Sequence, residues 1–418
     1  MIPVRARRRL KLVLKAANFA ELSDGFIPPA FATDSRLRVN GKSRNPACRK
    51  LKMSASARKL GPKKLVVALS LAGTLLVVVS LNALGLQNDS VSAAQVTEMI
   101  AQVRATSAAQ APTAGAFQLG RRLLIEARYG EAYELFTALL EKWPREPEAL
   151  YGAALSSFNL GHPADAEPLA RAASEVYLAG VGDRPRTNSA LPNQIIRGAD
   201  AIVLLAVIQG ARGEDTEALK SARRAVALAP GHFDAQFILG RASYGVGDSA
   251  TAVGAFRAAL KLKPDDARSL FFLATALESA GNTDAALDAY RDLIRLQPQA
   301  AEGHLGLGVL LTKRGGVDAR KGIEELRTAV RIDPNQYEAQ VTLGRALLTE
   351  KLATESVEHL KRAAELAPNN PEPHYQLALA YRRLGLNDKA AAETAIVKRI
   401  HEARRGDGTQ NNTARPNQ

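Results

Sequence analysis

The stretch Pro264–Pro298, PDDARSLFFLATALESAGNTDAALDAYRDLIRLQP, decides the fold. Apolar residues recur at helical spacing in each half: Phe272, Leu273, Ala276 and Leu277, then Leu287, Tyr290, Leu293 and Ile294. Gly281 stands between the halves and suits the left-handed turn that ends a helix. Pro298 stops the second helix, because proline lacks the amide hydrogen that a helix interior needs. The stretch therefore predicts two helices joined by a tight turn.

The same pattern recurs along most of the chain. Pro230, Pro264 and Pro298 lie 34 residues apart, Pro334 follows after 36, and Pro368 after another 34. A turn glycine comes 17 residues past the proline in most units. Nine and ten residues past each proline stands a leucine followed by a small residue: Leu239-Gly240, Leu273-Ala274, Leu307-Gly308, Leu343-Gly344 and Leu377-Ala378. Self-similarity at this period predicts an array of stacked helix pairs.

The pattern resembles the tetratricopeptide repeat (TPR) family in its Leu-Gly pair, the alanines of its second helix and its terminal proline. The resemblance implies an all-α fold, a right-handed α-solenoid of about eight TPR helix pairs. The units are 111–144, 145–178, 197–230, 231–264, 265–298, 299–334, 335–368 and 369–402. The sequence departs from the pattern in an insertion at 179–196, two extra residues at Gly316-Val317, and Lys351 in place of a turn glycine.

The formal net charge of +14 belongs to one end of the chain. Residues 1–64 hold 17 Lys/Arg and 3 Asp/Glu, so the rest of the chain is neutral in sum. The repeats therefore have no basic surplus to follow a phosphate backbone, and we expect no nucleic-acid partner. Cys48 is the only cysteine, which excludes an intramolecular disulfide and a cysteine-rich zinc site.

Residues 1–64 predict a basic, disordered cytoplasmic segment. Within it, Arg5–Lys15 also suits a helix lying on anionic lipid. Met53 is an alternative start, because the residues after it read as an ordinary short cytoplasmic lead.

Leu65–Leu86 predicts one transmembrane helix that precedes the repeats. Its 22 residues carry no charge, and as a helix they would span about 33 Å against a hydrocarbon core of about 30 Å. Lysines lie before the segment and Asp89 is the nearest charge after it. The positive-inside rule then predicts a single-pass protein of the bacterial inner membrane, with a cytoplasmic N-terminus and periplasmic repeats. A signal peptide cleaved at Ala83-Leu84-Gly85 is the alternative.

The segments that flank the repeats are short. Residues 87–110 predict a juxtamembrane helix, capped by Asp89 or Ser90, that covers the first repeat or serves self-association. The face that we expect it to bury consists of Val96, Met99, Ile100 and Val103. Residues 403–418 are polar and predict a disordered tail.

The sequence contains no recognisable catalytic motif. None of its six histidines forms a pair spaced for metal binding on one helix. Phosphate-binding loops, nucleophile elbows and haem-attachment motifs are also absent from it. We therefore expect a protein that is not an enzyme, with no catalytic residue, metal or cofactor.

In the TPR family the first helix of each unit lines a concave groove. Carried over by offset from each proline, the resemblance implies a partner-binding groove formed by Phe158, Phe237, Arg241, Tyr244, Phe271, Glu278, Leu305, Lys313, Arg345, Tyr375, Arg382 and Arg383. Aromatic residues and arginines dominate protein interfaces, and arginine pairs with carboxylates. Arg241, Arg345 and Arg382 therefore suit an acidic partner, although the full Lys/Asn set of the family's carboxylate-binding members is missing.

These observations predict a membrane-anchored TPR scaffold that binds partner proteins or peptides in its groove and assists assembly of a cell-envelope complex. Secretion, pilus, polysaccharide-export and cytochrome-maturation machineries are the complexes we consider. One alternative is a permanent structural subunit of a membrane complex, held through Leu65–Leu86. Another is a tethering or import receptor with cytosolic repeats. The sequence is silent on oligomeric state.

Overall fold

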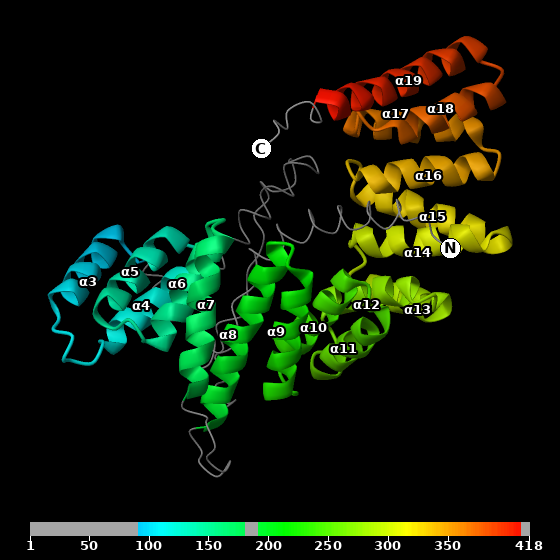
Figure 1. Ribbon diagram of the computed structural model, residues 1–418. Helices are drawn as coiled ribbons and strands as arrows, with labels where there is room; N and C mark the ends of the chain where they lie inside the picture. Colours follow the sequence, from blue (N-terminus) through cyan, green and yellow to red (C-terminus); the bar gives the residue numbers. More distant parts are fainter. Residues whose placement is uncertain (1–90, 180–190, 411–418) are drawn as a thin grey trace, which may run out of the picture. The chain divides into compact units, whose positions relative to one another are not determined.

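The structure, a computed structural model, describes residues 91–179 and 191–410 (Figure 1). Those residues form 17 helices, labelled α3–α19, and contain no strand. The predicted all-α repeat fold is therefore confirmed. The chain divides into two compact units, Met1–Arg212 and Gly213–Gln418.

The first unit contains a leading helix followed by paired helices. They are α3 (Ala93–Ala105), α4 (Ala114–Ile125), α5 (Tyr129–Lys142), α6 (Pro147–Asn159), α7 (Pro163–Ala179) and α8 (Leu191–Ala211). The pairs α4–α5 and α6–α7 are the first two predicted repeats, and α8 is the first helix of the third. Neighbouring helices pack together, and their buried side chains form one hydrophobic cluster from α3 to α8.

The insertion predicted at 179–196 is shorter in the structure. Helix α8 begins at Leu191, so residues 191–196 are helical. Pro192 is tolerated because it lies in the first helical turn, where amide hydrogens need no partner within the helix. Ile195 and Ile196 then lead directly into the apolar part of α8.

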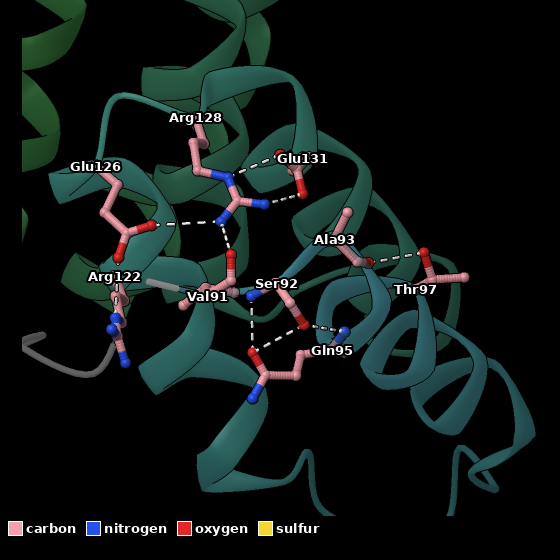
Figure 2. Close-up of polar contacts among 9 residues, drawn as sticks. All are labelled: Val91, Ser92, Ala93, Gln95, Thr97, Arg122, Glu126, Arg128 and Glu131. Atoms are coloured by element: carbon pink, nitrogen blue, oxygen red, sulfur yellow. Dashed lines mark hydrogen bonds and ion pairs between the residues drawn. The ribbon is translucent and has the colours of Figure 1, made fainter. Parts of the chain in front are cut away.

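Helix α3 covers the start of the first unit, and its buried face includes Val96, Ile100 and Val103, with Met99 partly buried beside them. The predicted caps Asp89 and Ser90 are not used. Ser92 Oγ instead accepts a hydrogen bond from the Gln95 amide at 3.2 Å, and the Gln95 side chain accepts one from the Ser92 amide at 2.8 Å (Figure 2). This reciprocal capping box explains why the helix starts after Ser92.

Arg128 fixes the start of α3 on the first helix pair. Its Nη1 donates to the carbonyl oxygen of Val91, and its Nε donates to Glu131 at 2.8 Å. Figure 2 shows the guanidinium directed at Val91 and lying between Glu131 and Glu126, whose Oε2 is 3.4 Å from Nη1. The turn between α4 and α5 therefore holds the main chain at residue 91 in place.

One described helix is long and apolar enough to cross a membrane. This is α8, in which Asn193–Ala211 passes that test, but 67% of the window is buried inside the fold. The buried residues include the polar Asp200 and Gln209, and α8 packs along α7. Such burial is typical of a core helix. The predicted membrane span, Leu65–Leu86, and the basic segment 1–64 lie outside the described residues and stay predictions.

The second unit contains α9 followed by five complete helix pairs. Its helices are α9 (Asp215–Leu228), α10 (Phe233–Val246), α11 (Ser249–Leu262), α12 (Ala267–Ser279), α13 (Thr283–Leu296), α14 (Ala301–Arg314), α15 (Gly316–Ile332), α16 (Tyr337–Thr349), α17 (Ala353–Leu366), α18 (Pro371–Arg383) and α19 (Asn387–Gln410). Each helix packs against the next one in the chain. The pairs follow one another in order (Figure 1).

A large apolar side chain on the second helix explains why the first helix carries glycine in the Leu-Gly pairs. The ring of Phe256 on α11 lies against Gly240 on α10, where an added Cβ would come within 2.6 Å of it. Leu326 on α15 lies against Gly308 on α14 in the same way, and an added Cβ would come within 2.7 Å of it. Both side chains are at most 2% exposed. A small residue on the first helix therefore lets the paired helices approach closely.

The turn at Lys351 forms despite the missing glycine. Lys351 adopts φ 66°, in the same left-handed region as Gly281 at 79° and Gly385 at 72°. The longer turn at Gly315 and Gly316 also uses positive φ at both residues. The hairpin geometry is thus retained at both departures from the pattern.

The last helix pair, α18–α19, differs from the earlier repeats. Thr394 occupies the position that Phe256, Tyr290 and Leu360 fill in earlier units, and it is exposed. A polar outer face on the terminal repeat is what a repeat array needs at its end. Helix α19 then runs on to Gln410, so residues 403–410 of the predicted disordered tail are helical. No proline lies there to stop the helix as it does in earlier units.

Candidate functional site

An aromatic cluster spans α10, α11 and α12 in the second unit. Phe237, predicted to face the groove, is only 4% exposed. Its ring packs edge-to-face against Phe256 at 5.9 Å and against Phe272 at 5.7 Å between centroids. Phe271 is partly exposed and lies 5.4 Å from Phe272. The prediction that Phe237 is presented to a partner is therefore corrected: it belongs to the floor of the site.

Arg241 lies over this floor. Its guanidinium carbon is 5.6 Å from the ring centroid of Phe272, within cation–π range. Burial, and to a lesser degree the nearby Arg268, lowers the pKa of Arg241 to about 10. Among the described residues no carboxylate forms an ion pair with Arg241. Arg268, in turn, stacks on Phe237 at 5.2 Å and lies 3.5 Å from Asp266. These residues form what we call the Arg241 site: Arg241, Arg268, Phe237 and Phe272.

A polar row continues from the Arg241 site toward α14. The Tyr244 hydroxyl accepts a hydrogen bond from Ser279 at 3.5 Å, and burial raises the pKa of Tyr244. Lys313 Nζ lies 2.6 Å from the carboxylate of Glu278. The predicted groove residues of α10, α12 and α14 are thus neighbours. Lys313 differs from Arg241 because it already has a carboxylate partner.

A cavity of about 250 Å³ lies between α14, α15 and α16. Arg345 and Lys313 stand at it, and Arg345 lies 3.4 Å from Glu372. Its lining is mostly aliphatic and small polar: Val309, Thr312, Ala319, Ile323, Thr342, Ala346 and Thr349, with Glu350. We call it the Arg345 pocket. Lys313 and Arg345 are both paired with carboxylates, so the pocket offers a ligand mainly its shape and its apolar surface.

The remaining predicted groove residues have other environments. Tyr375 is 56% exposed and Arg382 is also exposed on α18. Arg383 donates to the carbonyl oxygen of Leu348, so it joins α18 to α16. Phe158 is partly buried against the hydrophobic cluster of the first unit. Leu305 likewise packs beside a core cluster of the second unit.

Sequence reasoning did not assign Arg268 or Phe272 to the site, although it placed Phe272 on an apolar helix face. Both lie on the helix of the following repeat, at positions other than those used to transfer the groove. Arg268 reaches the Phe237 ring across the repeat boundary, which a within-repeat offset does not reveal. A search for a basic residue in the first turn of the next helix would have found it.

The arrangement suits recognition of an anion. A desolvated guanidinium without a carboxylate of its own gains most from a charged hydrogen-bonding partner. Within residues 91–179 and 191–410, no group of three or more His, Cys, Asp or Glu side chains is placed to hold a metal ion.

Similar solved structures have low sequence identity to this chain. The crystal structure of MamA is 20% identical, covers 40% of this chain and 97% of its own, and has a TM-score of 0.38. The Pseudomonas aeruginosa PilF structure is 18% identical, covers 49% of this chain and 92% of its own, and has a TM-score of 0.44. YrrB, described as a TPR protein with an unusual peptide-binding site, is 18% identical, covers 42% and 89%, and scores 0.36. A comparison with curated proteins found no significant match.

Family models match most of the helix pairs. A model described as tetratricopeptide repeat matches residues 117–176, 203–267, 239–301 and 273–319. A second, described as TPR repeat, matches residues 353–385. These matches coincide with the helix pairs of both units, and the chain belongs to the tetratricopeptide repeat family.

Proposed function

We propose that the chain is a membrane-anchored TPR scaffold that holds an acidic segment of a partner protein at the Arg241 site. The observation that carries the proposal is Arg241: a cation over an aromatic floor, with a lowered pKa and no ion pair to a described carboxylate. Keeping such a group desolvated costs stability unless a ligand pairs with it. A carboxylate of the partner supplies that pair.

The Arg345 pocket extends the same groove. Its aliphatic lining takes an apolar side chain of the bound segment, while its own ion pairs with Glu278 and Glu372 keep its charge balanced. The partner segment is thus acidic where it meets Arg241 and apolar where it meets the pocket. The scaffold would assist assembly of a periplasmic or inner-membrane complex, with Leu65–Leu86 as its anchor.

Photocrosslinking tests the groove. A photoreactive residue replaces Tyr244, which lies beside the Arg241 site, and the captured protein is identified by mass spectrometry from intact cells. We expect one dominant partner, lost on Arg241→Glu and retained on Arg257→Glu, because Arg257 is exposed on α11 and belongs to neither site. Capture that is unaffected by Arg241→Glu would refute the role of the Arg241 site.

Crosslinking at other positions and protease accessibility separate the alternatives. Capture only by probes within Leu65–Leu86 would favour a structural subunit held through that segment. Protease added to cells with an open outer membrane and an intact inner membrane should digest the repeats. Protection of the repeats under these conditions would favour the cytosolic receptor.

A further inference from the structure

The turns inside the last three helix pairs lie along one edge of the second unit. Arg314 Nη2 is 2.7 Å from Asp284, which joins the α14–α15 turn to the preceding one. The Arg345 pocket brings Lys313 together with Glu350, next to the α16–α17 turn. Arg383 at the end of α18 bonds to the Leu348 carbonyl near that turn. Consecutive turns are therefore neighbours.

This edge exposes aliphatic side chains. Val317 is 77% exposed, and Leu352, Leu384 and Leu386 are 44%, 37% and 41% exposed. Leu352 and Leu386 occupy the position that Asn282 holds in the α12–α13 turn. The fold therefore accepts a polar residue at this position, and the two leucines are not needed to close the turn.

Two departures from the repeat pattern fall on the same edge. The two extra residues, Gly316 and Val317, place Val317 at the tip of a turn that uses two positive-φ glycines, Gly315 and Gly316. Lys351 adopts a left-handed conformation where most repeats have glycine and the first has Ala127, although a side chain there is strained. Strain retained at a surface position points to a role outside folding.

The edge is also rich in cations without acidic partners. Among the described residues, four of its basic side chains form no ion pair: Arg320, Lys351, Arg382 and Lys389. The acidic side chains of these three turns are fewer than the basic ones: Asp318, Glu350 and Asp388. The turns of the two preceding pairs carry Asp248 and Asp284 and no Lys or Arg at their tips. Together with the four aliphatic residues, these four cations define what we call the turn edge.

We propose that the turn edge docks on an anionic lipid surface. Aliphatic residues flanked by Lys and Arg are the composition that binds at the level of lipid headgroups, where the chains insert and the cations meet phosphates. The turns of the two preceding pairs, which carry Asp248 and Asp284, do not have this composition. The inference is independent of the groove and extends the proposed function, because it gives the repeats a fixed orientation on a membrane.

Environment-sensitive fluorescence tests this proposal. The full chain with Cys48→Ser and Val317→Cys is labelled with the fluorophore NBD and reconstituted into bilayers with or without phosphatidylglycerol. We expect a blue shift of the emission and protection from iodide only with phosphatidylglycerol. The matched control is Asn282→Cys, exposed in an equivalent turn, and its label should stay accessible to iodide in both bilayers.

A double variant provides a second test of the docking proposal. Leu352→Asn with Leu386→Asn, which installs the residue of the α12–α13 turn, should reduce the Val317 shift while the circular dichroism spectrum is unchanged. A label at Val317 that remains in water on anionic bilayers would overturn the proposal, even where the chain itself stays in the membrane. A shift equal to that at Asn282, or one that requires a captured protein instead of lipid, would also overturn it.

Discussion

The Arg241 site and the Arg345 pocket come from the same offset in two repeats, yet they differ in chemistry. Arg241 lies over a phenylalanine floor and has no ion pair with a described carboxylate. Arg345 is exposed, pairs with Glu372, and stands at a cavity lined by small residues. The repeat determines where a side chain is placed, whereas the residues of the next repeat determine whether its charge is balanced.

The largest expected effect concerns the floor of the Arg241 site. Phe272→Ala removes a ring that contacts Phe237, Phe256 and Arg241, and should lower the free energy of unfolding by about 3–5 kcal/mol. Val309→Ala in the Arg345 pocket removes less buried surface and should cost about 1 kcal/mol. Urea denaturation measures both. If both variants lost the same free energy of unfolding, the two sites would not differ in how much their floors stabilise the fold.

Arg241→Met should have opposite effects on binding and stability. Affinity for the captured partner should fall at least about thirtyfold, as for an interface hot spot. The free protein should gain about 1 kcal/mol, because a desolvated cation is removed while its aliphatic part is kept. The gain is smaller than the lowered pKa alone implies, since part of the side chain remains in water. Isothermal titration and urea denaturation test the two parts, and a loss of stability would contradict the second.

The turns provide a smaller contrast. Lys351→Gly should stabilise the protein by up to about 1 kcal/mol, because glycine adopts the left-handed conformation without strain. Gly281→Lys in the α12–α13 turn should destabilise it by a similar amount. Thermal unfolding of the two variants measures both signs. No change at Lys351 would show that its backbone conformation is not strained.

The smallest effect is expected for the paired lysine. Lys313→Met removes an exposed ion pair with Glu278 and should change stability by less than about 1 kcal/mol. Its reduction of partner affinity should also be far below that of Arg241→Met. A loss as large as at Arg241 would mean that both cations contact the partner, and the distinction between the two regions would fail.

Most of the fold could be predicted from the sequence, because the same boundary residues recur in most repeats and support one another. The prolines, turn glycines and Leu-Gly pairs located the helices of all eight predicted repeats. Errors fell where this repetition ends: the cap at Ser92, the start of α8 at Leu191 and the extension of α19 to Gln410. At such positions the first or last residue of the helix depends on local capping and on whether a proline follows.

The candidate site was less predictable. Offsets correctly brought Arg241, Tyr244 and Glu278 to neighbouring helices, but they also assigned the buried Phe237 to the open surface. Exposure at one position depends on the size of the side chain that the next repeat places over it. In this case Phe272 covers Phe237, and that contact crosses a repeat boundary. Charge pairing also depends on the next repeat, because Glu372, the partner of Arg345, belongs to the repeat that follows.

A charge-swap measurement tests the central claim most directly. Once crosslinking from Tyr244 has identified the acidic residue of the partner, affinities are measured for the wild-type pair, for Arg241→Glu, and for Arg241→Glu with that acidic residue changed to lysine. The account predicts a loss of at least about thirtyfold in the single variant and recovery of most of it in the double variant. Wild-type affinity in the single variant, or no recovery in the double variant, would contradict it.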